Sequence, residues 1–177
     1  PRKKTCSTAI LNKHASSPMA DPEKLLGKEW AEVLGQEFEK QYMKKINAYV
    51  RERDSIVKVF PRPKWIFRAF RETPPSKCKA VIIGQDPYPH KAADGLAFSA
   101  SNDREAPASL QNIFEEMERS VGADLPKPPN DLSRWAREGV LLLNTYLTTE
   151  KNSPGAHRQI GWEKFTSKAI SYLGRPS

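Results

Sequence analysis

The sequence predicts an α/β fold built around a parallel β-sheet. Two apolar runs, at residues 80–83 (Ala-Val-Ile-Ile) and 139–144 (Gly-Val-Leu-Leu-Leu-Asn), are short and continuous, which is typical of strands buried on both faces. Helical patterns at residues 109–121 and 132–138 lie between them, so the order strand, helix, strand indicates a crossover connection. In such folds the functional side chains gather at the carboxyl ends of the strands.

Apolar residues at helical spacing predict the other helices. Stripes over residues 25–38 and 42–50 predict two amphipathic helices, and a shorter stripe over residues 65–70 predicts a third that ends before a proline pair. A last stripe over residues 162–173 predicts a helix that begins after Gly161.

The composition is that of one globular domain. The chain has 177 residues, of which 38% are hydrophobic, so it can bury a core without disulfides or a structural metal. Cys6 and Cys78 lie far apart, and we expect both to be reduced thiols. No apolar run approaches the ~20 residues of a membrane span, so we expect no membrane association. The 29 Lys and Arg against 21 Asp and Glu favour a polyanionic partner.

We divide the chain into a basic tail, residues 1–20, which we expect to be flexible, and a domain at residues 21–177. The tail has four basic residues, no acidic one and several Ser and Thr. Such a segment fits a transit peptide, a nuclear-type basic arm or an untranslated or artificially added extension, and all three remain open. We expect a nuclear or cytoplasmic protein, or a mitochondrial one if the tail is a transit peptide.

Polar residues follow both predicted strands directly. Residues 84–88 (Gly-Gln-Asp-Pro-Tyr) come after the first strand, and Asn144 ends the second. An isolated loop aspartate such as Asp86 is most often a turn former. Here Asp86, Tyr88, Phe98 and Asn144 all fall at strand ends or in loops, so we expect them to face one cleft.

Five ordered segments extend the pattern at the strand ends: AVIIGQDPY (80–88), DGLAFS (94–99), PASLQN (107–112), WAREGVLLLNT (135–145) and GWEKFT (161–166). Together they resemble the family 1 uracil-DNA glycosylases, and the resemblance extends over residues 26–173. It implies a three-layer α/β/α fold with a central parallel β-sheet.

The resemblance implies one catalytic residue and four uracil-binding residues. Asp86 would stabilise the positive charge on the sugar as the glycosidic bond breaks, and would orient the attacking water. Phe98 would stack on the flipped base, and the Asn144 amide would bind the N3 and O4 edge of uracil. Tyr88 would stand where the 5-methyl group of thymine would lie, and Gln85 would shape the pocket floor.

Contacts with the DNA backbone are implied as well. Pro107 and Ser109 match a Pro/Ser-rich loop of the family, where the Ser109 hydroxyl would bind a phosphate, cap the following helix, or do both. His157 falls where the family has a Ser-His pair near DNA, although a solvated loop histidine fits the sequence nearly as well.

The implied function is DNA repair. The protein would release uracil from single- or double-stranded DNA in base excision repair and leave an abasic site. The resemblance implies a monomer that needs no metal or cofactor, and the sequence has no Cys/His cluster at metal-ligand spacing. The alternative is a non-catalytic remnant of such an enzyme that binds DNA or a protein partner.

Two features depart from the family pattern. Pro89 stands where the family often has histidine, and His90 follows it. The family also continues into a further strand and a His-Pro-Ser-Pro-Leu loop, whose histidine donates to uracil O2 and whose leucine enters the duplex. Residues up to Ser177 do not contain them, so we expect an incomplete domain with its last strand missing. We also expect turnover at least about 10²-fold slower than that of a complete form.

Overall fold

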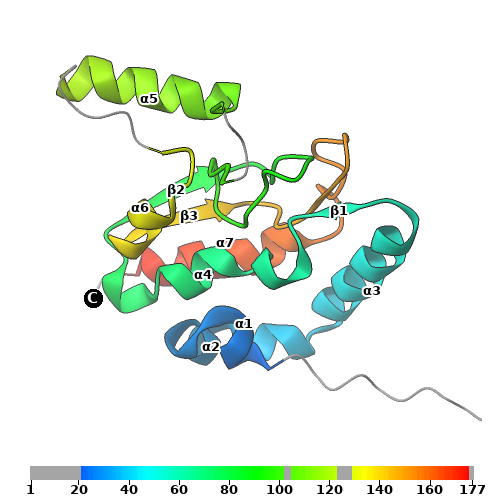
Figure 1. The fold of residues 1–177 in the computed structure, drawn as a ribbon. Helices are drawn as coiled ribbons and strands as arrows, with labels where there is room; N and C mark the ends of the chain where they lie inside the picture. Colours follow the sequence, from blue (N-terminus) through cyan, green and yellow to red (C-terminus); the bar gives the residue numbers. More distant parts are fainter. Residues whose placement is uncertain (1–20, 102–104, 123–128, 176–177) are drawn as a thin grey trace, which may run out of the picture.

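The computed structural model describes residues 21–101, 105–122 and 129–175 (Figure 1). The basic tail, including Cys6, lies outside the described residues. In chain order the elements are α1 (Pro22–Leu26), α2 (Lys28–Leu34), η1 (Gly35–Glu39), α3 (Gln41–Ile56), β1 (Val59–Phe60), η2 (Pro63–Trp65), α4 (Arg68–Glu72), η3 (Pro75–Lys77), β2 (Ala80–Gly84), α5 (Ala108–Val121), α6 (Ser133–Arg137), β3 (Val140–Asn144), β4 (Thr149–Glu150) and α7 (Trp162–Leu173).

The two predicted strands, β2 and β3, form a parallel pair. They pair over their whole length, and the last pair is Gly84 opposite Asn144. The other edge of β3 is also hydrogen-bonded, because the Ala97 N–H donates to Leu142 O at 3.0 Å. This register places the ends of both strands side by side, where the sequence predicts the site.

A second, antiparallel pair is not predicted by the sequence patterns. In it, Val59 of β1 lies opposite Glu150 of β4, and Phe60 lies opposite Thr149. Strands of two residues are too short to show the alternation that identifies a strand in a sequence. The pair joins the segment after α3 to the segment that follows β3.

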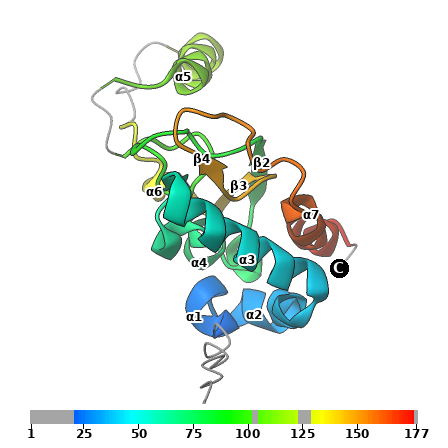
Figure 2. The same cartoon turned by 90° about the vertical axis from the view of Figure 1, so that its right-hand side faces the viewer.

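Helices lie on both sides of the parallel sheet. In Figures 1 and 2, α4 and α7 lie beneath the sheet with α1 and α2 beneath them, and α5 lies on the opposite side. Both α4 and α6 contact β3. The arrangement confirms the predicted α/β fold with a central parallel sheet between helical layers.

The core lies between β3 and the helices beneath it. Residues 141–143 of β3 are fully buried. Trp30 and Phe70 meet edge to face with ring centroids 5.3 Å apart, and Phe70 meets Phe165 in the same way at 5.6 Å. Trp30, Phe70 and Phe165, which come from three different predicted helical stripes, are therefore core residues.

The structure corrects two details of the sequence prediction. The strand β2 is not buried on both faces, since Val81 and Ile83 are 37% and 49% exposed. Side chains alternate between the two faces of a strand, so Val81 and Ile83 share one face of β2, and this face is only partly covered by the described residues. The first predicted helix is divided, because Gly27 has φ = 82° and separates α1 from α2.

Candidate active site

A pocket of about 330 Å³ opens at the carboxyl ends of β2 and β3. Its walls come from the end of β2 and the loop after it, the loop before α5, the first turn of α5, the end of β3 and the segment after β4. The lining residues are Gly84, Gln85, Asp86, Pro87, Tyr88, Pro89, Ala93, Gly95, Leu96, Phe98, Ser99, Ser109, Asn144 and Pro154. The pocket thus contains Asp86, all four predicted uracil-binding residues and one of the predicted DNA-contacting residues.

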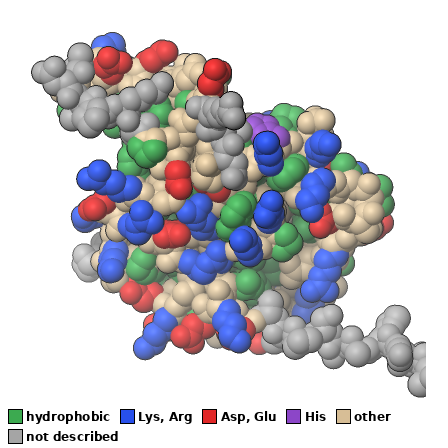
Figure 3. Space-filling view, viewed as in Figure 1, with side chains coloured by type: hydrophobic (Ala, Val, Ile, Leu, Met, Phe, Trp, Pro, Cys, Tyr) green, Lys and Arg blue, Asp and Glu red, His purple; other side chains and the backbone are tan. Residues whose placement is uncertain are grey.

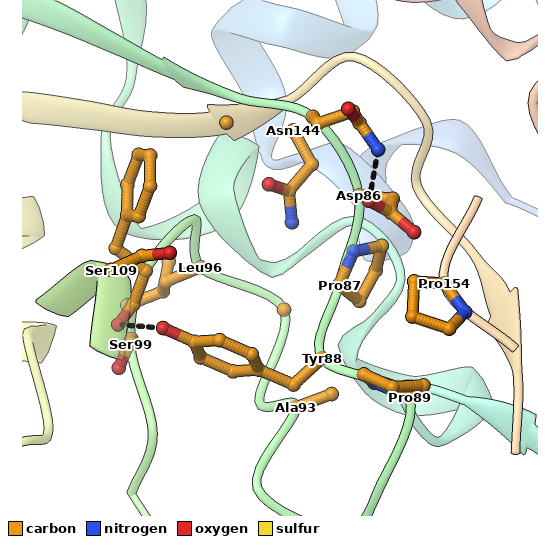
Figure 4. A pocket seen from close by; sticks show the side chains of 14 residues that line it. Asp86, Pro87, Tyr88, Pro89, Ala93, Leu96, Ser99, Ser109, Asn144 and Pro154 are labelled. Carbon is orange, nitrogen blue, oxygen red and sulfur yellow. Dashed lines mark hydrogen bonds between the residues drawn. The ribbon is translucent and has the colours of Figure 1, made fainter. Parts of the chain in front are cut away.

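The Asp86 carboxylate is held through both of its oxygens. Gln85 Nε2 donates to Asp86 Oδ1 at 2.9 Å, and the Gly155 N–H donates to Oδ2 at 2.5 Å. Figure 4 shows Asp86 at the side of the pocket with Pro87 and Pro154 near it. The Gly155 donor belongs to the backbone, so it favours one orientation of the carboxylate, as a group that acts on a bound substrate requires.

The loop that carries Asp86 is tied to the end of β3. The Thr145 N–H donates to Gly84 O at 2.9 Å, and the Tyr146 N–H donates to Gln85 O at 2.9 Å. These bonds continue the parallel pairing beyond the last residues of both strands. The polar loops after β2 and β3 are therefore joined by their backbones.

Asn144 projects into the pocket from the last position of β3 (Figure 4). Asn144 is only 6% exposed to solvent. A buried amide offers two N–H donors and one carbonyl acceptor in a fixed plane. This geometry is suited to the edge of a planar heterocycle that presents both an acceptor and a donor.

Tyr88 and Phe98 face the pocket from two parts of the long connection between β2 and α5. The Tyr88 hydroxyl donates to Phe98 O at 3.2 Å, which links these two parts. Phe98 has φ = 64°, in the left-handed region that residues other than glycine rarely adopt. A strained backbone at a pocket residue indicates that the surrounding structure fixes its position. The ring of His90 stacks on that of Tyr88, with centroids 5.7 Å apart.

A buried aspartate fixes the loop that carries Phe98. Asp94 is fully buried, and it accepts hydrogen bonds from the Ser99 hydroxyl at 2.6 Å and from the Leu96 N–H at 3.1 Å. Arg68 pairs with the same carboxylate at 3.3 Å. The two ends of this loop are therefore joined by side-chain hydrogen bonds to one group.

The three predicted DNA contacts have different outcomes. Ser109 is exposed and lines the pocket, but it does not cap α5, because Pro107 occupies the N-cap position. Pro107 is half-buried and is not among the lining residues. His157 is 0% exposed and its ring contacts other side chains, so it is not a solvated loop histidine, and its contact with DNA stays a prediction.

The contribution of residues 152–155 to the pocket is not predicted by the sequence. Pro154 lines the pocket and the Gly155 N–H binds Asp86, although neither residue type suggests chemistry. The sequence Asn-Ser-Pro-Gly signals only a turn. A backbone N–H donor cannot be identified from residue types. The turn signal is the one sequence feature that could have indicated this segment.

Two further observations concern possible metal ligands or membrane spans and the charge of the surface. Within the described ranges, His, Cys, Asp and Glu form no group of three that could hold a metal ion, and no helix is long and apolar enough to cross a membrane. Lys and Arg side chains are spread across the face seen in Figure 3, with acidic side chains among them. This distribution fits the net charge of +8.

Known proteins share both the sequence and the fold. Residues 70–175 match the family model described as the uracil DNA glycosylase superfamily. The chain is 46% identical over 149 residues to a uracil-DNA glycosylase of Borreliella burgdorferi, covering 82% of this chain and 66% of that protein. It is 42% identical over 161 residues to that of Wolinella succinogenes, covering 89% of this chain and 69% of that protein.

A crystal structure of mimivirus uracil-DNA glycosylase superposes with a TM-score of 0.77 and 29% identity, covering 88% of this chain and 59% of that chain. The chain thus spans about two thirds of the length of the curated relatives that it matches. Because the family model covers more than half of the chain and both relatives exceed 40% identity, the chain belongs to the uracil DNA glycosylase superfamily.

Proposed function

We propose that this protein is a uracil-DNA glycosylase, which takes deoxyuridine out of the DNA stack and hydrolyses its N-glycosidic bond. The observation that carries the proposal is the convergence of Asp86, Tyr88, Phe98 and Asn144 in one pocket at the ends of two parallel strands. The names of the relatives support the same function. The products would be free uracil and an abasic site.

Recognition of the base would use three of these side chains. Enzymes that act on a DNA base extrude it, read its Watson–Crick edge and stack an aromatic ring on its face. Asn144 would donate to O4 of uracil and accept from N3, a pattern that cytosine cannot match because it carries an amine at position 4. Phe98 would supply the stacking ring. Tyr88, held by its bond to Phe98 O, would exclude the methyl group of thymine.

Asp86 would act on the sugar. Breaking the bond between C1′ and N1 leaves positive charge on the sugar, which a nearby carboxylate stabilises. The same group can orient the water that attacks C1′ and accept its proton. Because Gln85 and Gly155 already hold the carboxylate, little reorganisation is needed when the charge develops.

The phosphate backbone would meet the positively charged surface. The net charge of +8 favours binding to a polyanion, with an affinity that falls as salt rises. Ser109, exposed in the first turn of α5 and at the pocket, would bind a phosphate beside the extruded nucleotide. We propose that a monomer acts on either single- or double-stranded DNA, because the pocket is built from one chain and reads one extruded nucleotide.

Uracil release under single-turnover conditions tests the function. The substrate is a labelled oligonucleotide with one deoxyuridine, single-stranded or paired, and abasic sites are revealed by alkaline cleavage. We expect release of uracil but not thymine, with or without a metal chelator. Asp86→Asn should lower the rate at least about 100-fold, because it removes the charge that opposes the sugar cation. Glu115→Gln, which neutralises an exposed carboxylate on α5, is the matched control and should keep the native rate.

DNA binding is measured in parallel with the same oligonucleotides. Binding without any release of uracil, in a folded protein, would contradict the proposed activity and favour the non-catalytic alternative. Equal release of uracil and thymine, or loss of release on adding the chelator, would contradict the proposed specificity or chemistry.

A further inference from the structure

A line of buried hydrogen bonds runs through His157. Trp162 Nε1 donates to Thr148 Oγ1 at 2.7 Å, and the same hydroxyl lies 2.7 Å from His157 Nδ1. On the other side of the ring, His157 Nε2 lies 3.3 Å from Glu150 Oε1. Arg53 donates to both oxygens of Glu150, at 2.6 and 3.0 Å. We call these five residues the His157 network.

The donors and acceptors fix where the protons lie in the His157 network. An indole and a guanidinium can only donate, and a carboxylate can only accept. The proton on Nε2 of His157 must therefore point to Glu150, and the Thr148 hydroxyl can donate to the bare Nδ1. Burial lowers the pKa of His157, in agreement with a neutral ring. Both ring nitrogens are satisfied in this arrangement, so the ring keeps a single orientation.

The network holds both ends of a short loop that reaches the pocket. Residues 151–156 lie between two of its members. Within this loop, the Gly155 N–H donates to Asp86 Oδ2 and the Asn152 N–H donates to Pro89 O at 2.9 Å. The loop is thus tied at its ends to the His157 network, and between them to the segment that carries the catalytic candidate.

We propose that His157 is a positioning residue for Asp86. The proposal rests on the proposed function, in which Asp86 is the catalytic carboxylate. His157 does not line the pocket, and it acts by fixing residues 151–156 so that the Gly155 N–H holds one carboxylate oxygen. Gln85 holds the other oxygen. Without the imidazole the end of the loop loses its anchor, and Asp86 loses the donor that sets its orientation.

Hydrogen exchange of the Gly155 amide tests this link without any measurement of activity. We expect His157→Leu to speed the exchange of this amide about 10-fold or more, because the amide is no longer held against Asp86. Asp86→Ala should speed exchange of the same amide. His157→Gln, whose amide can still donate to Glu150, should restore most of the protection. The amide of Leu142, in the buried strand β3, should keep its native exchange and so report that the fold is intact.

Single-turnover uracil release gives the functional readout. We expect His157→Leu to lower the rate constant at saturating DNA about 10-fold, with little change in the DNA concentration that gives half the maximal rate. In the Asp86→Ala protein the same substitution should have no further effect, because the group through which it acts is absent. Thr73→Val removes an equally buried, hydrogen-bonded hydroxyl outside the pocket and should change neither the rate nor the Gly155 exchange.

Unchanged exchange of Gly155 in a folded His157→Leu protein would overturn the proposal. A loss of rate that is equally large with and without Asp86 would overturn it as well. Absence of uracil release from the native protein would instead contradict the proposed function, and the exchange measurement would still decide the role of His157. Should His157→Leu fail to fold, Thr148→Val, which removes the hydroxyl that faces the ring and accepts from Trp162, takes its place with the same expected results.

Discussion

Gly84 lies directly against the side chain of Asn144, at the point where the parallel strands end. A Cβ atom added at Gly84 would lie 2.3 Å from Asn144 Oδ1 and 3.0 Å from Ala97 Cβ. No side chain fits in this space. The glycine at this position is therefore needed for Asn144 to occupy its place in the pocket, independently of any special backbone conformation.

Gly84→Ala should displace Asn144 and slow uracil release at least about 10-fold, because mispairing one buried polar group costs about 1–3 kcal/mol. Release is measured under single-turnover conditions, with folding checked by circular dichroism. Gly35→Ala is the control, since its added Cβ would meet Pro22 at an ordinary 3.6 Å. Native release by Gly84→Ala would mean that the position of Asn144 does not matter for the base.

Asn144→Asp should change which base is accepted. A carboxylate cannot donate to O4 of uracil, but it can accept from the amine of cytosine. We expect uracil release to fall about 100-fold and cytosine release to become detectable, because an acceptor facing an acceptor leaves both unpaired. The products are identified by chromatography of the released bases. Unchanged uracil release without any cytosine release would show that Asn144 does not read the base edge.

Tyr88 offers two substitutions that separate size from hydrogen bonding. Tyr88→Ala opens the space proposed to exclude the 5-methyl group, so we expect release of thymine from DNA to appear. Tyr88→Phe keeps the ring and removes the hydroxyl that donates to Phe98 O, so thymine should still be excluded. Thymine release by both variants, or by neither, would argue against steric exclusion by this ring.

The sequence predicts the parts of the site that lie in continuous patterns. The apolar runs identify β2 and β3, and their register brings residue 84 opposite residue 144. Because Asp86, Tyr88 and Asn144 lie at or just after the ends of these runs, the pattern alone is enough to predict that they share one cleft. The fold and the family are predictable in the same way, because both depend on long ordered segments.

The contributions that the sequence does not predict depend on tertiary contacts and on a backbone donor. The burial of His157 follows from Thr148, Glu150 and Tyr49 closing around it, the last with ring centroids 5.4 Å apart. The donor to Asp86 is a backbone N–H, which any residue except proline supplies. The partial exposure of β2 likewise depends on what packs beside it, which an apolar run cannot reveal.

The His157 network also predicts how stability changes with pH. Burial lowers the pKa of His157, and the hydrogen bond from Arg53 lowers the pKa of Glu150. A group whose pKa is lowered by folding binds fewer protons in the folded state than in the unfolded state. Its contribution to stability is therefore present above its ordinary pKa and is lost as the pH falls through its folded value.

His157 should cause the first loss of stability, beginning below about pH 6.5, and Glu150 a second loss below about pH 4.3. We expect the free energy of unfolding, measured by urea denaturation, to fall between about pH 6.5 and pH 5 in the native protein. In His157→Gln the decline over this range should be smaller, because glutamine does not titrate. Thr73→Val should be less stable at every pH but keep the native slope, since it leaves the histidine in place. Equal slopes for the native protein and His157→Gln would mean that the ring can take up a proton without loss of stability, and that a neutral imidazole is not required to hold the loop beside Asp86.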